Sequence, residues 1–391
     1  MSDALILDAT RTPWGKFGGG LRDYAAHDLA ALLIRTLVER NHLDPLSVEG
    51  VLLGQVISAG AGQLPSRQAL IKGGLPETTP STMINKVCAS GMRAVSLASQ
   101  LIRAGENELL LAGGMESMSN VPYYDKDTRW GARMGNKTLV DGMVHDGLWC
   151  AFDNCHMANQ GDEMAANREI SRAEMDDWSV RSQQLWGKAF ERGYFDREVT
   201  PVPNKRDTNH VALARDESPR PASTAERLGR ITPVWGTKAI TAGNAPGVND
   251  GAAVLVVASA ERAEKMDATP IARIIGHAEV ATKPREFPIA SAWAIQKVLQ
   301  KAGVALDEVE IIEVNEAFAA VPLICGQELG WEPARVNRHG GSVAMGHPIG
   351  ASGARLTMTA AYQLQESGAR YAVAAICSGT GQGDAILLER V

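Results

Sequence analysis

The feature that most constrains the fold of this chain is an internal repeat. The five residues Ala89–Arg93 (Ala-Ser-Gly-Met-Arg) recur at Ala351–Arg355 as Ala-Ser-Gly-Ala-Arg. In both copies a stretch with helical apolar spacing follows, reaches a glycine and then enters an apolar, strand-like run. The two glycines are Gly105 and Gly368, and the two runs are Glu108–Ala112 and Tyr371–Ile376. Matching segments in the same order indicate a duplicated structural unit.

Two further correspondences extend the repeat. Helical spacing over Leu29–Arg40 and Ala292–Ala302 is followed in each case by a Leu-Asp turn and a short strand-like run. These runs are Gly50–Leu53 and Val309–Val314, and a third pair of strand-like segments is 250–255 and 383–388. Alternating helices and buried strands are typical of an α/β protein, so the chain is predicted to consist of two similar α/β halves.

The first half is interrupted between about Ser119 and Gly247. This segment is rich in proline, with one clear helix pair expected around Arg172–Arg192, and such a long insertion favours a functional cap. Residues 205–230 hold six Lys/Arg against four Asp/Glu, which is either a solvated mixed surface or a site for an anion. We predict a first half at 1–118 and 248–268, an inserted loop domain at 119–247, and a second half at 269–391.

Composition narrows the function. The net charge of −6 argues against nucleic acid as a partner but leaves room for an anionic small molecule. The five cysteines are odd in number and sparse, which favours reduced thiols. The N-terminus lacks the pattern of a signal peptide, and no apolar run is long enough to cross a bilayer. A cytoplasmic protein without a membrane partner is expected.

Several common catalytic signatures are absent, and glycine-rich turns surround the reactive residues that remain. Cys150, Cys155 and His156 lack a fourth ligand for structural zinc, so no metal site is expected. Cys88 stands where a strand should end and a helix begin, a position at which the helix dipole can stabilise a thiolate. A small buried cysteine without chemistry is the alternative interpretation.

Two other turns carry candidate groups. Five glycines in 340–353 predict tight turns around His347, which could act as a base or remain a simple turn residue. Cys377 follows a buried strand and precedes Gly379, whose backbone N–H is unhindered. Because the repeat places the Cys88 turn and the His347 turn at equivalent positions, we expect them to meet at the centre of the molecule.

These motifs resemble those of the thiolase family along nearly the whole chain. The resembling segments are 11–19, 85–91, 241–245, 315–319, 346–353 and 377–379. The resemblance implies the thiolase fold: two five-stranded α/β halves in a layered αβαβα arrangement, with an inserted loop domain over the active site.

The resemblance also implies roles for single residues. Cys88 resembles the acylated nucleophile, His347 the acceptor of its proton, and Cys377 the acid/base for the α-carbon. Asn315 resembles the residue that holds a water, which with His347 stabilises the enolate oxygen. The N–H groups of Cys88 and Gly379 would form the oxyanion hole. The positions that resemble the coenzyme A channel are Leu148, His156, Met157, Arg220, Ile231, Trp235, Ala242 and Phe318.

The function implied is an acyl-CoA C-acyltransferase that condenses acyl-CoA with acetyl-CoA or cleaves 3-ketoacyl-CoA with coenzyme A. Acyl-CoA and coenzyme A would be its partners, with no permanently bound cofactor, in a homodimer or homotetramer. Acetoacetyl-CoA metabolism and fatty-acid β-oxidation both stay open, because Pro246 and Phe287 depart from the usual serine and methionine of the family. The alternatives are a decarboxylating ketoacyl synthase and a non-catalytic CoA- or lipid-binding relative.

Overall fold

Both halves of the chain contribute to one continuous sheet in the computed structural model, which describes residues 2–391. The sheet has ten strands in the order β14-β15-β16-β13-β1-β12-β5-β3-β4, with β2 paired to β12. The strands are β1 (Ala4–Arg11), β2 (Gly15–Lys16), β3 (Gly50–Gly54), β4 (Ser81–Ile84), β5 (Leu109–Ser117), β12 (Asn249–Ser259), β13 (Ala272–Ala281), β14 (Val309–Val314), β15 (Tyr371–Ser378) and β16 (Gln382–Glu389).

The strand order shows the duplication directly. The first half runs β4-β3-β5-β12-β1, and the second runs β14-β15-β16-β13, with Val336 beside Ile312 of β14 in the place of β4. The halves join where β1 pairs antiparallel with β13, from Ala4 opposite Ile274 to Ile6 opposite Ala272. The parallel pairs β3–β4, β3–β5 and β14–β15 lie at equivalent places in the two halves. The predicted duplicated α/β fold is therefore confirmed.

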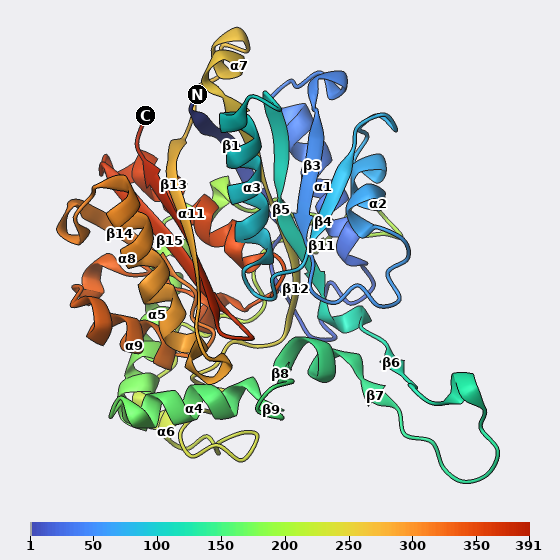
Figure 1. Cartoon of the computed structure of the whole chain (residues 1–391), viewed down its shortest axis with the longest axis vertical. Coiled ribbons are helices and arrows are strands. Elements are labelled where there is room, and N and C mark those ends of the chain that lie inside the picture. The colour runs from blue at the N-terminus through green and yellow to red at the C-terminus, as the bar shows by residue number, and fades with distance from the viewer. Residues whose placement is uncertain (1) are drawn as a thin grey trace.

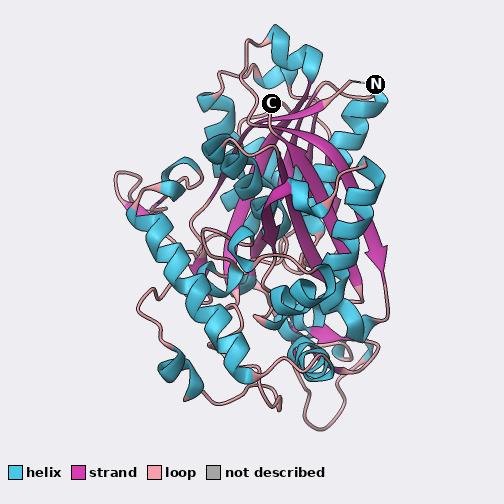
Figure 2. Ribbon diagram, turned by 90° about the vertical axis from the view of Figure 1, so that its left-hand side faces the viewer, coloured by secondary structure: helices cyan, strands magenta, loops and turns pink. Residues whose placement is uncertain are grey.

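Helices form three layers around the strands, as the predicted αβαβα arrangement requires. They are α1 (Ala26–Arg40), α2 (Pro65–Lys72), α3 (Ser90–Ala104), α4 (Met157–Asn167), α5 (Arg172–Glu191), α6 (Ala225–Gly229), α7 (Ala260–Lys265), α8 (Ala290–Ala302), α9 (Ala320–Leu329), α10 (Ser342–Met345) and α11 (Ser352–Ser367). Helices α1 and α2 cover the first half and α8 and α9 the second, on either side of the strands (Figures 1 and 2).

Helices α3 and α11, one from each half, pack together in the central layer. Their contact depends on small residues, since a Cβ on Gly91 would come within 2.7 Å of the Gly350 carbonyl oxygen. A Cβ on Gly353 would likewise lie 2.5 Å from the backbone nitrogen of Met92. Both helices end at the predicted glycines, Gly105 and Gly368, which take left-handed φ angles of 77° and 71°. The repeated Ala-Ser-Gly motifs thus bring the two halves into contact.

Residues 119–247 form short hairpins and three α-helices at one end of the sheet. They are the hairpins β6 (Tyr123–Tyr124) with β7 (Val140–Asp141), β8 (Trp149–Cys150) with β9 (Cys155–His156), and β10 (Val202–Pro203) with β11 (Val211–Leu213), together with α4, α5 and α6. The β6–β7 arm projects from the body, and α4 and α6 lie below the sheet (Figure 1). The helix pair expected around Arg172–Arg192 is instead the single helix α5, because the Ser171 capping box starts one uninterrupted helix of twenty residues.

A buried ion cluster holds this segment on β1. The guanidinium of Arg11 contacts both oxygens of Asp216, at 2.7 and 3.0 Å, and its Nε lies 3.3 Å from Glu198. All three side chains are removed from solvent, so each charge depends on the others for stabilisation.

Among residues 2–391, the helices are all too short or too polar to span a bilayer.

Candidate active site

The candidate site lies at the ends of strands from both halves. Asn315 follows β14, Cys377 lies near the end of β15, and Cys88 and His347 occupy the turns that lead into α3 and α11. Carboxyl ends of parallel strands meet at one edge of a sheet, which is where α/β folds build binding sites. The central helix pair brings the two turns together, as the repeat predicts.

Cys88 sits in a tight turn. Val87 adopts a left-handed φ of 48°, a conformation that costs of the order of 1–3 kcal/mol for a β-branched residue. The turn is held by Ser90, whose hydroxyl donates to the Val87 carbonyl at 2.6 Å and accepts from the Lys86 N–H at 2.8 Å. The serine of the repeated motif therefore fixes the backbone that presents the thiol.

The charge state of Cys88 is set by its surroundings. Burial raises the pKa of this thiol to about 12, and nearby Glu116 adds to the rise, whereas the N–H groups of Gly379 and of Cys88 itself lower it. Helix α3 begins two residues later, at Ser90, so its N-terminus does not outweigh the loss of solvation. Cys88 is thus a neutral thiol at rest, and it needs a base to react.

His347 is the candidate for that base. Its Nδ1 lies 2.6 Å from the Ser352 hydroxyl, which itself donates to the Pro348 carbonyl at 2.8 Å. Since the serine proton is used, Ser352 accepts from Nδ1–H, and the free lone pair of the imidazole is on Nε2. Burial and the positive charge of Arg355 lower the pKa of His347 to about 3, so the ring is neutral and able to take a proton. Sequence reasoning assigned no role to Ser352, although its match with Ser90 in the repeat was visible.

Asn315 directs its amide at the same imidazole. Its Nδ2 lies 3.3 Å from His347 Nε2, and its Oδ1 accepts from the Ser342 hydroxyl at 2.7 Å. The role implied for Asn315, to hold a water, stays a prediction, and its amide also lies within reach of the histidine. Both side chains are buried, so the geometry is shielded from solvent exchange.

Cys377 is the second thiol of the site and is wholly buried. Burial raises its pKa well above the ordinary value, with the charges of Cys88 and Cys325 as smaller causes. The influence of Cys88 on Cys377, and of the Gly379 N–H on Cys88, places the β15 end beside the Cys88 turn. Cys88 and Cys377 are therefore neighbouring neutral thiols, and Cys88 shares an apolar cluster with Ile349 of the His347 turn.

Two buried carboxyl groups, which sequence reasoning missed, assemble these turns. Glu116 accepts from the N–H groups of Val56, Ile57 and Gly350, at 3.0 to 3.2 Å, and burial raises its pKa to about 8. The signal for Glu116 in the sequence was a single glutamate at the end of an apolar run.

Glu316, the second buried carboxyl group, holds α10 in place. It accepts from the side chains of Trp178, Ser182 and Asn337 and from the Val343 N–H. Gly341 permits this approach, because a Cβ there would lie 2.3 Å from Glu316 Cδ. The carboxyl group thereby links the inserted segment, the end of β14 and the loop that carries Ser342.

A cavity of about 300 Å³ opens onto His347 between the inserted segment and both halves. Of the positions that resemble the coenzyme A channel, it is lined by Leu148, His156, Met157, Trp235, Ala242 and Phe318. Pro246 also lines it. Arg220 is exposed and Ile231 packs against Gly243, and neither belongs to this lining.

His156 presents an unused donor to this cavity. It stacks on Trp235 at 4.2 Å, and its Nδ1 accepts from the Ala158 N–H at 3.1 Å. The ring proton must therefore be on Nε2, a buried atom that has no hydrogen-bond partner within the described residues. Burial lowers the pKa of His156 to about 4, so the ring is neutral. A buried donor facing a cavity is suited to a carbonyl oxygen of a ligand.

The basic balance of residues 205–230 is divided in the structure. Lys205 binds Asp28 at 2.8 Å on the far side of the first half, and Arg230 pairs with Glu226 on α6.

Phe287 is buried and contacts Phe318 edge-on with ring centres 6.4 Å apart. All five cysteines are free thiols. Across residues 2–391 no group of three or more His, Cys, Asp or Glu side chains could hold a metal ion.

Comparisons with known proteins agree with this geometry. Residues 4–261 match the family model described as thiolase, N-terminal domain, and residues 268–390 match thiolase, C-terminal domain. The chain is 43% identical over 392 residues to an acetyl-CoA acetyltransferase of Pseudomonas aeruginosa, with 100% of both covered. The Bacillus anthracis acetyl-CoA acetyltransferase structure superposes with a TM-score of 0.96 at 36% identity, over 100% of this chain and 99% of that one. Human mitochondrial 3-ketoacyl-CoA thiolase gives 0.96 at 34%, with the same coverage.

Proposed function

The chain belongs to the thiolase family and is an acyltransferase that uses coenzyme A thioesters, and we propose that Cys88 carries the acyl group between them. The observation that supports the assignment is that Cys88 lies beside a second thiol, Cys377, and that its turn packs against the turn of His347, a neutral imidazole with its lone pair on Nε2. A synthase that condenses by decarboxylation has less need of a second thiol, because carbon dioxide loss, not proton removal, creates its carbanion.

In the first half-reaction His347 Nε2 takes the Cys88 proton, and the sulfur attacks the 3-carbonyl of a 3-ketoacyl-CoA. We propose that the N–H groups of Cys88 and Gly379, which both lie near the Cys88 sulfur, bind the oxygen that becomes negative; each such donor contributes about 3–4 kcal/mol in comparable sites. The bond between C2 and C3 then breaks, which leaves an acyl thioester on Cys88 and the enolate of acetyl-CoA. Proton transfer to His347 is needed because the buried thiol is neutral at rest.

In the same step the enolate must be stabilised and protonated. Its oxygen can be met by Asn315 and by protonated His347, which lie together. Cys377 delivers its proton to the α-carbon, and acetyl-CoA leaves. The Cys377 thiolate then takes the proton of the coenzyme A thiol, whose sulfur attacks the acyl-Cys88 thioester. Cys88 departs as the leaving group and takes back its proton from His347, which restores all three groups. Condensation is the same sequence in reverse.

The pantetheine arm is proposed to lie in the cavity beside His347. The buried Nε2–H of His156 supports this placement, because it offers a hydrogen bond that an amide carbonyl of the arm would complete. Trp235, half-exposed and stacked on His156, would cover the arm from the solvent side. Arg220 is then a contact for the nucleotide phosphates outside the cavity, where its exposure is an advantage.

We further propose a short-chain substrate of the acetoacetyl-CoA type. The residues packed around Cys88 are apolar and form one cluster with Met118 and Ile349, and Phe287 packs against Phe318. Fatty-acid β-oxidation would need room for longer chains. The reactive thiols also suit the reducing cytoplasm. A homotetramer is proposed through the β6–β7 arm, whose Trp130 and Met134 are 87% and 95% exposed.

The test is thiolysis of acetoacetyl-CoA by Cys88→Ala beside the wild type. The variant should lose turnover and should no longer become labelled by radioactive acetyl-CoA, since no other thiol is assigned the acyl group. Wild-type turnover in this variant would disprove the assigned nucleophile. A rate series on 3-ketoacyl-CoA substrates from four to sixteen carbons tests the chain-length proposal, which fails if the longer chains are preferred.

A further inference from the structure

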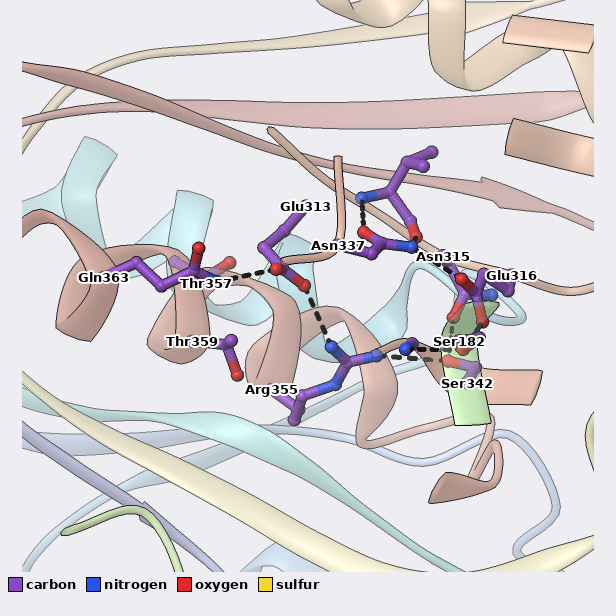
Figure 3. A network of polar contacts seen from close by, with 12 residues as sticks. Ser182, Glu313, Asn315, Glu316, Asn337, Ser342, Arg355, Thr357, Thr359 and Gln363 are labelled. Atoms are coloured by element: carbon purple, nitrogen blue, oxygen red, sulfur yellow. Dashed lines mark hydrogen bonds and ion pairs between the residues drawn. The ribbon is translucent and has the colours of Figure 1, made fainter. Parts of the chain in front are cut away.

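A chain of buried polar side chains runs from Gln363 through Glu313, Arg355 and Ser342 to Asn315 (Figure 3). Arg355, on the central helix α11, is fully buried and extends two of its guanidinium nitrogens to different partners. Its Nη1 lies 3.2 Å from Glu313 Oε2, and its Nη2 lies 3.1 Å from the Ser342 hydroxyl. Gln363 holds the other oxygen of Glu313 at 2.7 Å. The guanidinium is thereby fixed at both ends.

The direction of each hydrogen bond in this chain follows from the donor and acceptor inventory. A guanidinium has only donors, so Ser342 must accept from Arg355 and has its own proton free for another acceptor. That acceptor is Asn315 Oδ1, at 2.7 Å. With Oδ1 occupied as an acceptor, the amide group of Asn315 has one orientation, in which Nδ2 lies 3.3 Å from His347 Nε2.

We propose that Arg355 and Ser342 are positioning residues for the reaction, which fix the Asn315 amide with its N–H toward His347. The inference rests on the proposed roles of Asn315 and His347 and adds two residues that touch neither substrate nor Cys88. Their action is to remove the alternative orientation of an amide that is nearly symmetric in shape.

The alternative orientation of the Asn315 amide would be unfavourable for the reaction. Without the Ser342 proton, rotation of the Asn315 amide by 180° would point Oδ1 at Nε2 and turn the N–H away from the enolate oxygen. An oxygen in that place repels a developing negative charge, whereas the N–H stabilises it. Preorganisation of this kind avoids the cost of turning the group during the reaction.

The buried ion pair makes the device durable. Glu313 and Arg355 are both wholly removed from solvent, and Arg355 also lies over the Trp14 ring at 5.6 Å. The guanidinium therefore cannot turn to water and keeps its Nη2 on Ser342. A lysine would present one ammonium and could not occupy both the Glu313 and the Ser342 contacts.

The experiment compares Ser342→Ala with Ser179→Ala in the full-length enzyme. Ser179 is a matched control because it is a buried serine, distant in sequence from the network, whose hydroxyl donates only to the Met175 carbonyl. Loss of one orienting contact, worth about 1–2 kcal/mol, should lower kcat for acetoacetyl-CoA thiolysis about 5- to 30-fold. The KM for coenzyme A should stay at the wild-type value, since the cavity is untouched. Ser342→Thr, which keeps the hydroxyl, should recover most of the turnover.

The proposal is overturned if Ser342→Ala turns over like Ser179→Ala, or if its loss of kcat comes with a raised KM and is not recovered by threonine. Arg355→Lys supplies a second measurement should the alanine variant fold poorly, and wild-type kcat in that variant would equally overturn it. Asn315→Ala separates the two levels of argument. If Asn315→Ala itself is fully active, the assigned role of Asn315 is wrong; if only the Ser342 and Arg355 variants are active, the positioning inference alone fails.

Discussion

Replacement of Ser352 by alanine is expected to slow the enzyme although Ser352 touches no substrate. Within residues 2–391, its hydroxyl is the only hydrogen-bond partner of His347 Nδ1, at 2.6 Å. This contact selects the tautomer that has its proton on Nδ1 and its lone pair on Nε2. In Ser352→Ala the Nδ1–H loses its acceptor, and the ring can shift its proton to Nε2, where it can no longer take one from Cys88.

The magnitude follows from the charge that develops. When His347 accepts the Cys88 proton, the Nδ1–H···Oγ contact becomes a hydrogen bond to a cation in a buried site. Such bonds contribute about 1.5–3 kcal/mol, so kcat should fall about 10- to 150-fold. Folding should be affected less, because helix α11 keeps its buried contacts with strands of both halves.

The assay is acetoacetyl-CoA thiolysis at saturating coenzyme A, with thermal unfolding of the same preparations. Alkylation of Cys88 by iodoacetamide gives a second readout, and it should slow in the variant because His347 no longer assists deprotonation. A variant with wild-type kcat and wild-type alkylation would refute the tautomer argument. A fall in the unfolding temperature far beyond that of the control Ser179→Ala, with unchanged alkylation, would assign Ser352 a structural role only.

Two other predictions concern buried titratable groups. Burial raises the pKa of Glu116 from 4.5 to about 8, so as the pH rises through this window the unfolded chain loses a proton that the folded protein keeps, and stability falls. In Glu116→Gln this loss of stability is absent. The Tm of the variant minus the Tm of the wild type should therefore rise from pH 5 to about pH 8 and then level off. A difference that stays constant with pH contradicts the raised pKa. His156→Phe keeps the stacking on Trp235 but removes the Nε2 donor, so KM for coenzyme A should rise about fivefold with kcat unchanged. A loss confined to kcat would contradict the proposed pantetheine contact.

Much of the fold could be predicted from the sequence, because local patterns report local structure. The helical spacing at Leu29–Arg40 and the terminal glycines Gly105 and Gly368 correspond to α1 and to the ends of α3 and α11. The length of α5 was misjudged, since the mixed composition of the insertion hides one continuous helix. The repeat predicted that the turns of Cys88 and His347 would meet, because equivalent segments of a duplicated unit occupy equivalent places.

The sequence by itself determined which reactive groups the protein has and in what order: two thiols and an imidazole in glycine-containing turns, and an amide after a strand. Only the tertiary structure decided their protonation and orientation. Cys88 is a neutral thiol, since burial outweighs the stabilisation that the start of α3 can give a thiolate. The acceptor on His347 Nδ1, the proton on Ser342 and the carboxyl group of Glu116 come from residues far apart in the chain. A pKa or a tautomer depends on the atoms within a few ångströms, and in this fold those atoms are brought together by the packing of one half against the other.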